Sequence, residues 1–118
     1  MKKNTILLAT LFLLLLGVVY FKEGDNEKAV ELITEALDTK HQFPAAHSNL
    51  GSVYKAQGRL EDAANCYRKA IDCQEDFTEA HFNLGNVLKD LHQLIEAEAC
   101  YQKAIILNPD FADAHHNI

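Results

Sequence analysis

Histidine and cysteine are the residues of this chain that have the chemistry to hold a metal ion or to attack a substrate. His47, His81 and His115 lie at equal, long intervals along the chain, which is not a metal-ligand spacing. No phosphate-binding glycine loop or nucleophile elbow occurs. We therefore expect packing roles for these histidines and for the thiols, and we expect no catalytic residue, no metal and no cofactor. The three cysteines are an odd number without a Cys-x-x-Cys pair: Cys66, Cys73 and Cys100.

A series of side-chain amides repeats at the same interval. Asn49, Asn83 and Asn117 each follow one of those histidines by two residues. A side-chain amide both donates and accepts hydrogen bonds, so a row of amides can hold the backbone of an extended peptide. The alternative is that the amides only meet solvent, and the sequence leaves both open. The other candidate site residues are Ser52, Asn86, Lys55 and Lys89, of which the two lysines favour a partner with acidic character.

These intervals belong to an internal repeat of the sequence. Residues 44–77 and 78–111 are identical at 16 of 34 positions, and residues 114–118 begin the pattern again. Such a period predicts a solenoid of stacked units. Apolar residues recur at intervals of three and four from residue 29 onward, which is helical spacing, and no strand pattern follows Phe21. The expected helices of the two full units are 44–56, 60–73, 78–91 and 94–107.

Residues 1–21 form a hydrophobic segment. No charge lies between Lys3 and Lys22, and a positive start before an apolar run is typical of a signal peptide or signal anchor. We expect membrane anchoring through residues 5–21, with a cytoplasmic location as the alternative. The alternative rests on the repeat, because residues 10–43 have the register of a first unit whose leading helix is unusually apolar. The same residues can hardly lie in a membrane and also pack as the leading helix of a repeat.

The composition of the chain indicates a folded protein and argues against one class of partner, nucleic acid. The chain carries a net charge of −6 and is 48% hydrophobic, so it can bury a core and is not of disordered composition. A nucleic-acid partner is not expected, because no basic stripe with interleaved aromatic residues is present.

The repeat resembles the tetratricopeptide repeat (TPR), a helix-turn-helix unit of about 34 residues. The resemblance implies an all-α, right-handed solenoid of about three repeats plus a partial fourth. It places a degenerate first repeat at 10–43, full repeats at 44–77 and 78–111, and the start of a fourth at 112–118. It also implies that the leading helices line a concave groove. The resemblance is carried by Leu50, Gly51, Tyr54, Gly58, Ala63, Tyr67 and Ala70, and by Leu84, Gly85, Leu88, Ala97, Tyr101, Ala104 and Pro109.

Two packing expectations follow from this register. Gly51 and Ala63 should let the helices of one pair approach closely, while Tyr67 fills a gap at the next interface. His92 stands where Gly24 and Gly58 stand. Its turn therefore either forces a bulky residue toward positive φ or adopts another geometry.

As a function, the resemblance implies a protein–protein interaction module that binds a partner polypeptide in the groove, and not an enzyme. The run Ala46–Leu50 also resembles the repeats of O-linked N-acetylglucosamine transferases, where an asparagine ladder holds polypeptide substrates. A substrate-recruiting fragment of a glycosyltransferase-like enzyme is therefore the alternative. The groove that clamps a terminal carboxylate is not matched, because Asp113 and Asn117 stand where basic residues are needed.

The end of the sequence gives one further expectation. Residues 112–118 begin a helix and stop at Ile118 without a polar capping helix, which repeat arrays normally need. We expect a fragment, a truncated product, or self-association or partner binding through this uncapped C-terminal end.

Overall fold

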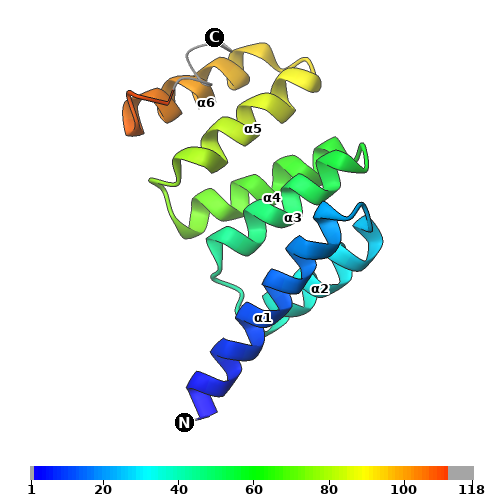
Figure 1. The fold of residues 1–118 in the computed structure, drawn as a ribbon. Coiled ribbons are helices and arrows are strands. Elements are labelled where there is room, and N and C mark those ends of the chain that lie inside the picture. Colours follow the sequence, from blue (N-terminus) through cyan, green and yellow to red (C-terminus); the bar gives the residue numbers. More distant parts are fainter. Residues whose placement is uncertain (1, 112–118) are drawn as a thin grey trace.

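The computed structural model describes residues 2–111, and all regular structure in this range is α-helical. Six helices form three hairpins, which stack because α2 packs on α3 and α4 packs on α5 (Figure 1). The predicted all-α solenoid of about three repeats is confirmed. Residues 112–118, including Asn117 and the uncapped end, lie outside the described residues. The helices are α1 (Lys2–Lys22), α2 (Asn26–Thr39), α3 (Pro44–Ala56), α4 (Leu60–Cys73), α5 (Thr78–Asp90) and α6 (Leu94–Leu107).

The three hairpins turn in the same way. The residue at the bend has positive φ in each: 89° at Gly24, 77° at Gly58 and 63° at His92. At the third bend the N–H of His92 donates to the carbonyl of Lys89 at 3.0 Å, and the N–H of Gln93 donates to that of Leu88 at 2.8 Å. The same two bonds recur at the other bends. His92 thus copies the glycine geometry, and a bulky side chain occupies the left-handed region.

Within the second and third hairpins a tyrosine ring lies against a glycine. A Cβ atom on Gly51 would lie 2.8 Å from Cε1 of Tyr67, and one on Gly85 would lie 2.7 Å from Cε1 of Tyr101. Contacts that short do not occur, so both positions require glycine. The predicted neighbour of Gly51, Ala63, is not the nearest residue. The Tyr67 ring reaches Gly51 first because it turns into its own hairpin.

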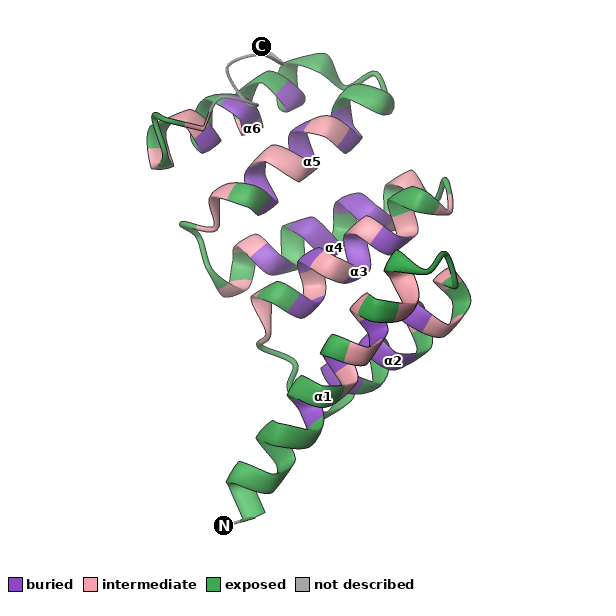
Figure 2. Ribbon diagram, in the orientation of Figure 1, coloured by how far each residue is buried: buried purple, intermediate pink, exposed green. Residues whose placement is uncertain are grey.

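Helix α1 is longer than the other leading helices. It has 21 residues, whereas α3 and α5 have 13 each, a difference of eight. Residues 2–9 are these extra eight, and all are exposed beyond the hairpin (Figure 2). From Thr10 onward α1 packs on α2. The Thr10 hydroxyl oxygen lies 2.5 Å from that of Thr39, and a Cβ on Gly17 would lie 2.7 Å from Cγ1 of Ile33.

The buried side chains form two clusters along the stack. The first joins α1 to α4 and contains Leu14, Ile33 and Leu50. The second joins α4 to α6 and is built around Tyr67, Leu84 and Tyr101. Each cluster mixes residues of a hairpin with residues of its neighbour, so burial fixes the order in which the three hairpins stack.

Candidate functional site

The asparagine series lies on the leading helices. Asn49 is in α3 and Asn83 is in α5, one repeat apart, and both are half-buried. Among the hydrogen bonds within residues 2–111, none uses the side-chain amide of either residue. Since these amides bond no protein group of that range and are not among its buried unpaired polar atoms, they are accessible and can bond either water or a ligand. The third member, Asn117, lies outside the described residues.

Ser52 and Asn86 serve the interior of the hairpins. The Tyr67 hydroxyl lies 2.9 Å from Ser52 Oγ, which itself donates to the carbonyl of Ser48 at 3.3 Å. The Tyr101 hydroxyl donates to Oδ1 of Asn86 at 2.6 Å. Burial raises the pKa of Tyr67, and the hydrogen bond with Ser52 lowers it in part. Burial also raises the pKa of Tyr101. Both tyrosines therefore stay protonated and link the two helices of a hairpin.

The two lysines of the candidate site are exposed near the ends of their helices. Lys55 lies in the last turn of α3, and Lys89 lies in the last turn of α5. Neither forms an ion pair with any residue of the range 2–111. Positive charge at a helix C-terminus is favourable, and both ammonium groups are accessible to an acidic ligand.

The histidines of the repeat hold the loops between hairpins. His47 Nε2 lies 2.8 Å from the carbonyl oxygen of His41, and His81 Nε2 lies 2.8 Å from that of Glu75. A carbonyl only accepts, so Nε2 carries the proton and donates in both. No group of three or more His, Cys, Asp or Glu side chains in the described residues is arranged to hold a metal ion. The rings of His47 and His81 thus brace these loops through hydrogen bonds.

Two of the three cysteines do not have the properties of nucleophiles. Cys66 is buried, Cys73 and Cys100 are partly buried, and all three are free thiols. Burial raises the pKa of Cys66 to about 11 and raises that of Cys100 as well. The thiolate is the reactive form, so these two thiols stay protonated at neutral pH.

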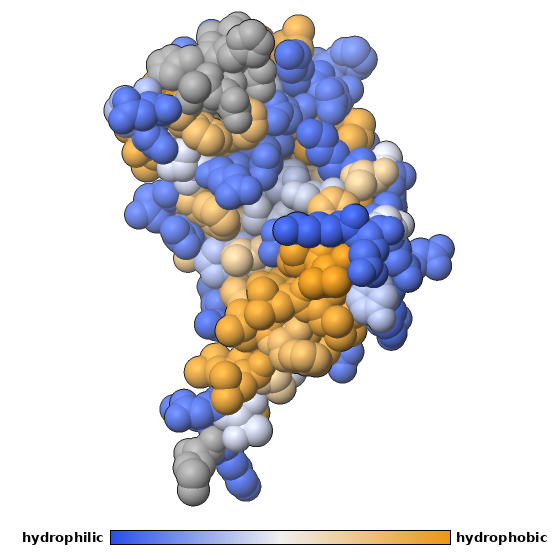
Figure 3. Space-filling model, viewed as in Figure 1, coloured by the Kyte–Doolittle hydropathy of each residue, from blue (hydrophilic) through white to orange (hydrophobic). Residues whose placement is uncertain are grey.

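An apolar surface covers the side of α1 that faces away from α2. Figure 3 shows this surface gathered over α1, whereas the rest of the same view is mixed and carries many polar side chains. Leu15 belongs to it and stands one repeat before Asn49, so the row of Asn49 and Asn83 continues onto an apolar residue. The large exposed side chains of α1 are Ile6, Leu7, Leu8, Leu11, Phe12, Leu15 and Val19.

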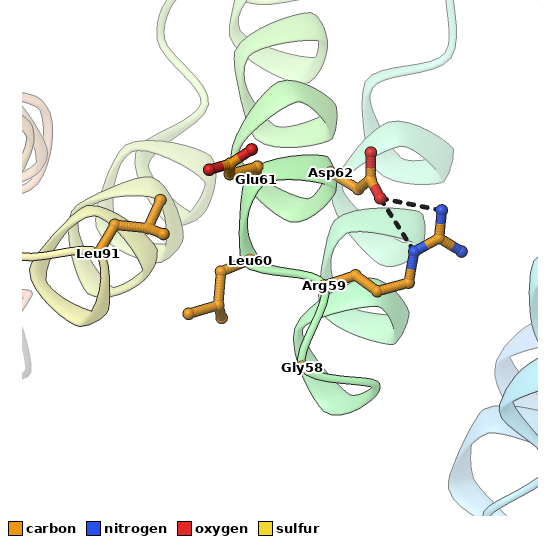
Figure 4. Close-up of a pocket in the computed structure, with 6 residues that line it drawn as sticks. All are labelled: Gly58, Arg59, Leu60, Glu61, Asp62 and Leu91. Carbon is orange, nitrogen blue, oxygen red and sulfur yellow. Dashed lines mark hydrogen bonds and ion pairs between the residues drawn. The ribbon is translucent and has the colours of Figure 1, made fainter.

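A hollow beside the second hairpin turn is bounded by Gly58, Leu60, Glu61 and Leu91 (Figure 4). The Arg59 guanidinium at its edge bonds Asp62 through Nε and Nη2, both at 2.9 Å. It also lies over the Tyr54 ring, 4.4 Å from the centroid. The arginine is thus already paired with Asp62, and the other charged group at the hollow is the Glu61 carboxylate.

Sequence reasoning missed two features of these surfaces. One is the division of α1 into a side that packs on α2 and an exposed apolar side. Helical periodicity does not indicate this division, because nearly every residue of α1 is apolar. The other is the exposure of Ile95 and Ile106 on α6, at 88% and 71%. Their signal was present in the repeat, since both replace acidic residues of the preceding units.

Comparison with protein families gives matches along most of the chain. A model described as "TPR repeat" matches residues 17–58 and 51–91, and the "Tetratricopeptide repeat" model matches residues 78–111. No curated protein matches the chain closely enough to count as a relative.

Solved structures with the same architecture are numerous. The first TPR of Spaghetti (RPAP3), bound to the HSP90 peptide SRMEEVD, is 25% identical at a TM-score of 0.90, with 92% of this chain and 86% of that one covered. The Sgt2 TPR domain from Aspergillus fumigatus is 26% identical at 0.82, with 86% and 67% covered. The Arabidopsis OM64 TPR domain, 21% identical at 0.86 with 91% and 88% covered, is similar in fold.

Proposed function

The chain belongs to the tetratricopeptide repeat family, and from this premise we propose that it binds an extended segment of a partner polypeptide along α3 and α5. The observation that carries the proposal is the pair Asn49 and Asn83. They lie one repeat apart on successive leading helices, half-buried and without hydrogen-bond partners among residues 2–111. Each amide can give one donor and one acceptor to a peptide unit. Asn117 would be the third member of this row.

The surroundings of the two asparagines support a peptide with some acidic character. Lys55 and Lys89 stand six residues further along the same helices, exposed and outside any ion pair within residues 2–111. Ser52 and Asn86 line the same helices while bonding the hairpin tyrosines. An acidic peptide is also what occupies the similar RPAP3 repeat structure.

The proposed partner is recognised along its backbone and not by its chain end. No Lys or Arg stands within four residues of Asn49 or Asn83 along α3 and α5, so these helices do not place a cluster of basic side chains around the amides. An amidated acidic peptide should therefore bind as well as the same peptide with a free C-terminus.

The test replaces Asn49 and Asn83 together with alanine. Partners are first recovered with the wild-type chain and mapped to a peptide segment, whose affinity is then measured by calorimetry. We expect the double variant to lose roughly 1–3 kcal/mol of binding free energy if its hydrogen bonds are desolvated in the complex. Stability should change by less than about 0.5 kcal/mol, because both side chains lie outside the core clusters.

Asn65→Ala is the matched control, because Asn65 is an exposed asparagine on the trailing helix α4. It should leave binding unchanged. Lys55→Ala with Lys89→Ala should mainly slow association and reduce its dependence on salt. Unchanged affinity of the double asparagine variant for every recovered peptide would refute the proposal and place binding on another surface.

A second candidate function is recruitment of polypeptide substrates for a glycosyltransferase-like catalytic domain. The same asparagine row supports it, since holding a polypeptide is what both functions require. Sequencing the open reading frame past Ile118 distinguishes the two: a catalytic domain downstream supports recruitment, and a stop codon leaves the interaction module.

The N-terminal helix supports a proposal about where the module is located. Helix α1 is long and apolar enough, by length and composition, to cross a membrane, and little of it is buried within the fold. We propose that residues 5–21 anchor the module to a membrane. A cytoplasmic module whose α1 stays on α2 is the alternative, and fractionation of the full chain separates the two.

A further inference from the structure

The outward faces of the trailing helices differ between repeats. Four positions of α2, α4 and α6 correspond through the register of the repeat, and all twelve residues are exposed. They are polar in the first two helices, with acidic residues at both ends, but mostly apolar in the third. The residues are Glu27, Glu31, Thr34 and Asp38 on α2; Glu61, Asn65, Arg68 and Asp72 on α4; and Ile95, Ala99, Gln102 and Ile106 on α6.

Intervals of four, three and four residues put the four residues of α6 on one face of the helix. We call Ile95, Ala99, Gln102 and Ile106 the α6 stripe. The two isoleucines at its ends are 88% and 71% exposed. They are eleven residues apart, which is about 16 Å along the helix axis. Two isoleucines this exposed on one face, where the sister helices carry acids, indicate a surface with a partner.

A further repeat would not cover the stripe. The corresponding face of α2 stays exposed although α3 follows it, and that of α4 stays exposed although α5 follows it. The helices of the next hairpin pack instead on other residues of the trailing helix, such as Tyr67 in α4. The next hairpin touches this face of α4 at its edge, where Glu96 lies 3.8 Å from Arg68. A helix stacked after α6 in the same way would therefore leave most of the α6 stripe open.

We propose that the α6 stripe binds the α6 stripe of a second copy of this chain, with the two helices antiparallel about a twofold axis. The stripe has the symmetry that such pairing needs. Ile95 and Ile106 are equally far from the midpoint of Ala99 and Gln102, so Ile95 meets the partner's Ile106 at both ends. In the middle Ala99 meets the partner's Gln102, where the small alanine lets the helices approach.

The charges beside the stripe select the antiparallel arrangement. Glu96 and Lys103 lie on the same flank of α6, seven residues apart, which is about 10 Å of helix rise. This is too far for the two residues to pair within one chain. Glu96 instead lies 3.8 Å from Arg68 of α4 in an exposed ion pair, which it would share with the partner's Lys103. In the antiparallel pair, flanks of the same kind meet, so Glu96 comes next to the partner's Lys103 and the ion pair forms twice. In a parallel pair opposite flanks meet, so Glu96 would face the flank of the partner's Glu98 and neither ion pair with Lys103 could form.

Zero-length carbodiimide crosslinking tests the proposal on the full chain, in membranes or in nonionic detergent. The expected product is a covalent dimer whose digest contains a Glu96–Lys103 amide, detected by mass spectrometry. Because the two residues cannot reach each other within one helix, this crosslink reports two copies. It also distinguishes the α6 stripe from contacts made by the apolar side of α1.

Two sets of variants make the test decisive. Ile95→Glu with Ile106→Asp installs the residues that α4 carries at these positions, so the fold should persist while the crosslink falls about tenfold or more. The matched control, Glu61→Gln with Asp72→Asn on α4, should leave the crosslink unchanged. Glu96→Lys or Lys103→Glu alone should weaken the dimer, and the two together should restore it. Absence of the wild-type crosslink, or no loss with the isoleucine variants, overturns the proposal.

Discussion

At the scale of the residue, His92 is the position where the backbone conformation suits the side chain least. The turn between α5 and α6 has the backbone of the two earlier turns, and those use glycine. Because only glycine adopts positive φ without a steric penalty, the third hairpin folds against a strained residue. Its φ of 63° is a consequence of the hydrogen bonds that the repeat requires there.

Replacing His92 with glycine should therefore stabilise the protein. We expect the free energy of unfolding to rise by roughly 0.5–1 kcal/mol, the relief of strain being partly offset by the freer unfolded chain. Thermal melts of the parent and the variant measure the change. The reverse exchange, Gly58→His, should lower stability, since no atom lies within 4 Å of a Cβ at that turn and backbone strain alone acts. An unchanged or lower midpoint for His92→Gly would contradict this account.

Residue identities predicted the turn positions but not every contact around them. The positive φ at His92 could be anticipated from its register with Gly24 and Gly58. The bond between Tyr101 and Asn86 could not, because it depends on how far a ring reaches across two helices. The candidate site was accordingly predicted as a set of groove residues, two of which also bond within the hairpins.

At the scale of the element, the hairpin is the unit of packing. The distance between its two helices is set by a tyrosine ring that packs against a glycine. Gly51 and Tyr67 form this contact in the second hairpin, and Gly85 and Tyr101 form it in the third. In the first hairpin Ile33 replaces the tyrosine, and α1 still approaches α2 closely at Gly17. The glycine is therefore required by helix approach and not by the tyrosine alone.

Gly51→Ala should overpack the second hairpin. The added methyl group would lie 2.8 Å from the Tyr67 ring, so we expect a loss of about 1–3 kcal/mol in the free energy of unfolding. Urea melts measure it. Tyr67→Leu removes the ring, so the double variant should lose less than the sum of the single losses. Strictly additive losses would show that the ring and the glycine do not meet.

Helix bounds were the part of the fold most readily predicted from the sequence. The expected segments 44–56, 60–73 and 94–107 coincide with α3, α4 and α6, and α5 ends one residue before the expected Leu91. The repeat made this possible, because each boundary is marked by a proline, a turn or a change of apolar spacing. The partner of Gly51 was not predictable, because register along one helix does not say which side chain of the other reaches it first.

At the scale of the whole molecule, α1 has features of two roles that exclude each other, a membrane-spanning helix and a helix packed on α2. Its 21 residues span about 31 Å, close to the hydrocarbon thickness of a bilayer. Yet Thr10, Leu14 and Gly17 are buried against α2, which leaves eight free residues, or about 12 Å. A spanning α1 must therefore leave α2, whereas an α1 that stays on α2 can only lie on a surface.

Fractionation of the full chain separates these states. We expect it to pellet with membranes and to resist carbonate extraction, because its exposed apolar side chains favour lipid. A chain carrying Thr10→Cys and Thr39→Cys reports whether α1 has left α2, since the two hydroxyl oxygens are 2.5 Å apart in the fold. The disulfide should be absent from the carbonate-resistant fraction. Complete recovery in the soluble fraction would end the anchor proposal, and a disulfide in the membrane fraction would place α1 on the membrane surface.

The tyrosines that close the second and third hairpins also make the molecule easy to observe. The chain contains four tyrosines and no tryptophan, so its near-ultraviolet absorption and its intrinsic fluorescence come mainly from phenol rings. Tyr67 and Tyr101 are buried and hydrogen-bonded to Ser52 and Asn86, and opening either hairpin returns its ring to water. Each of these two repeats thus carries its own optical probe, without any label being added.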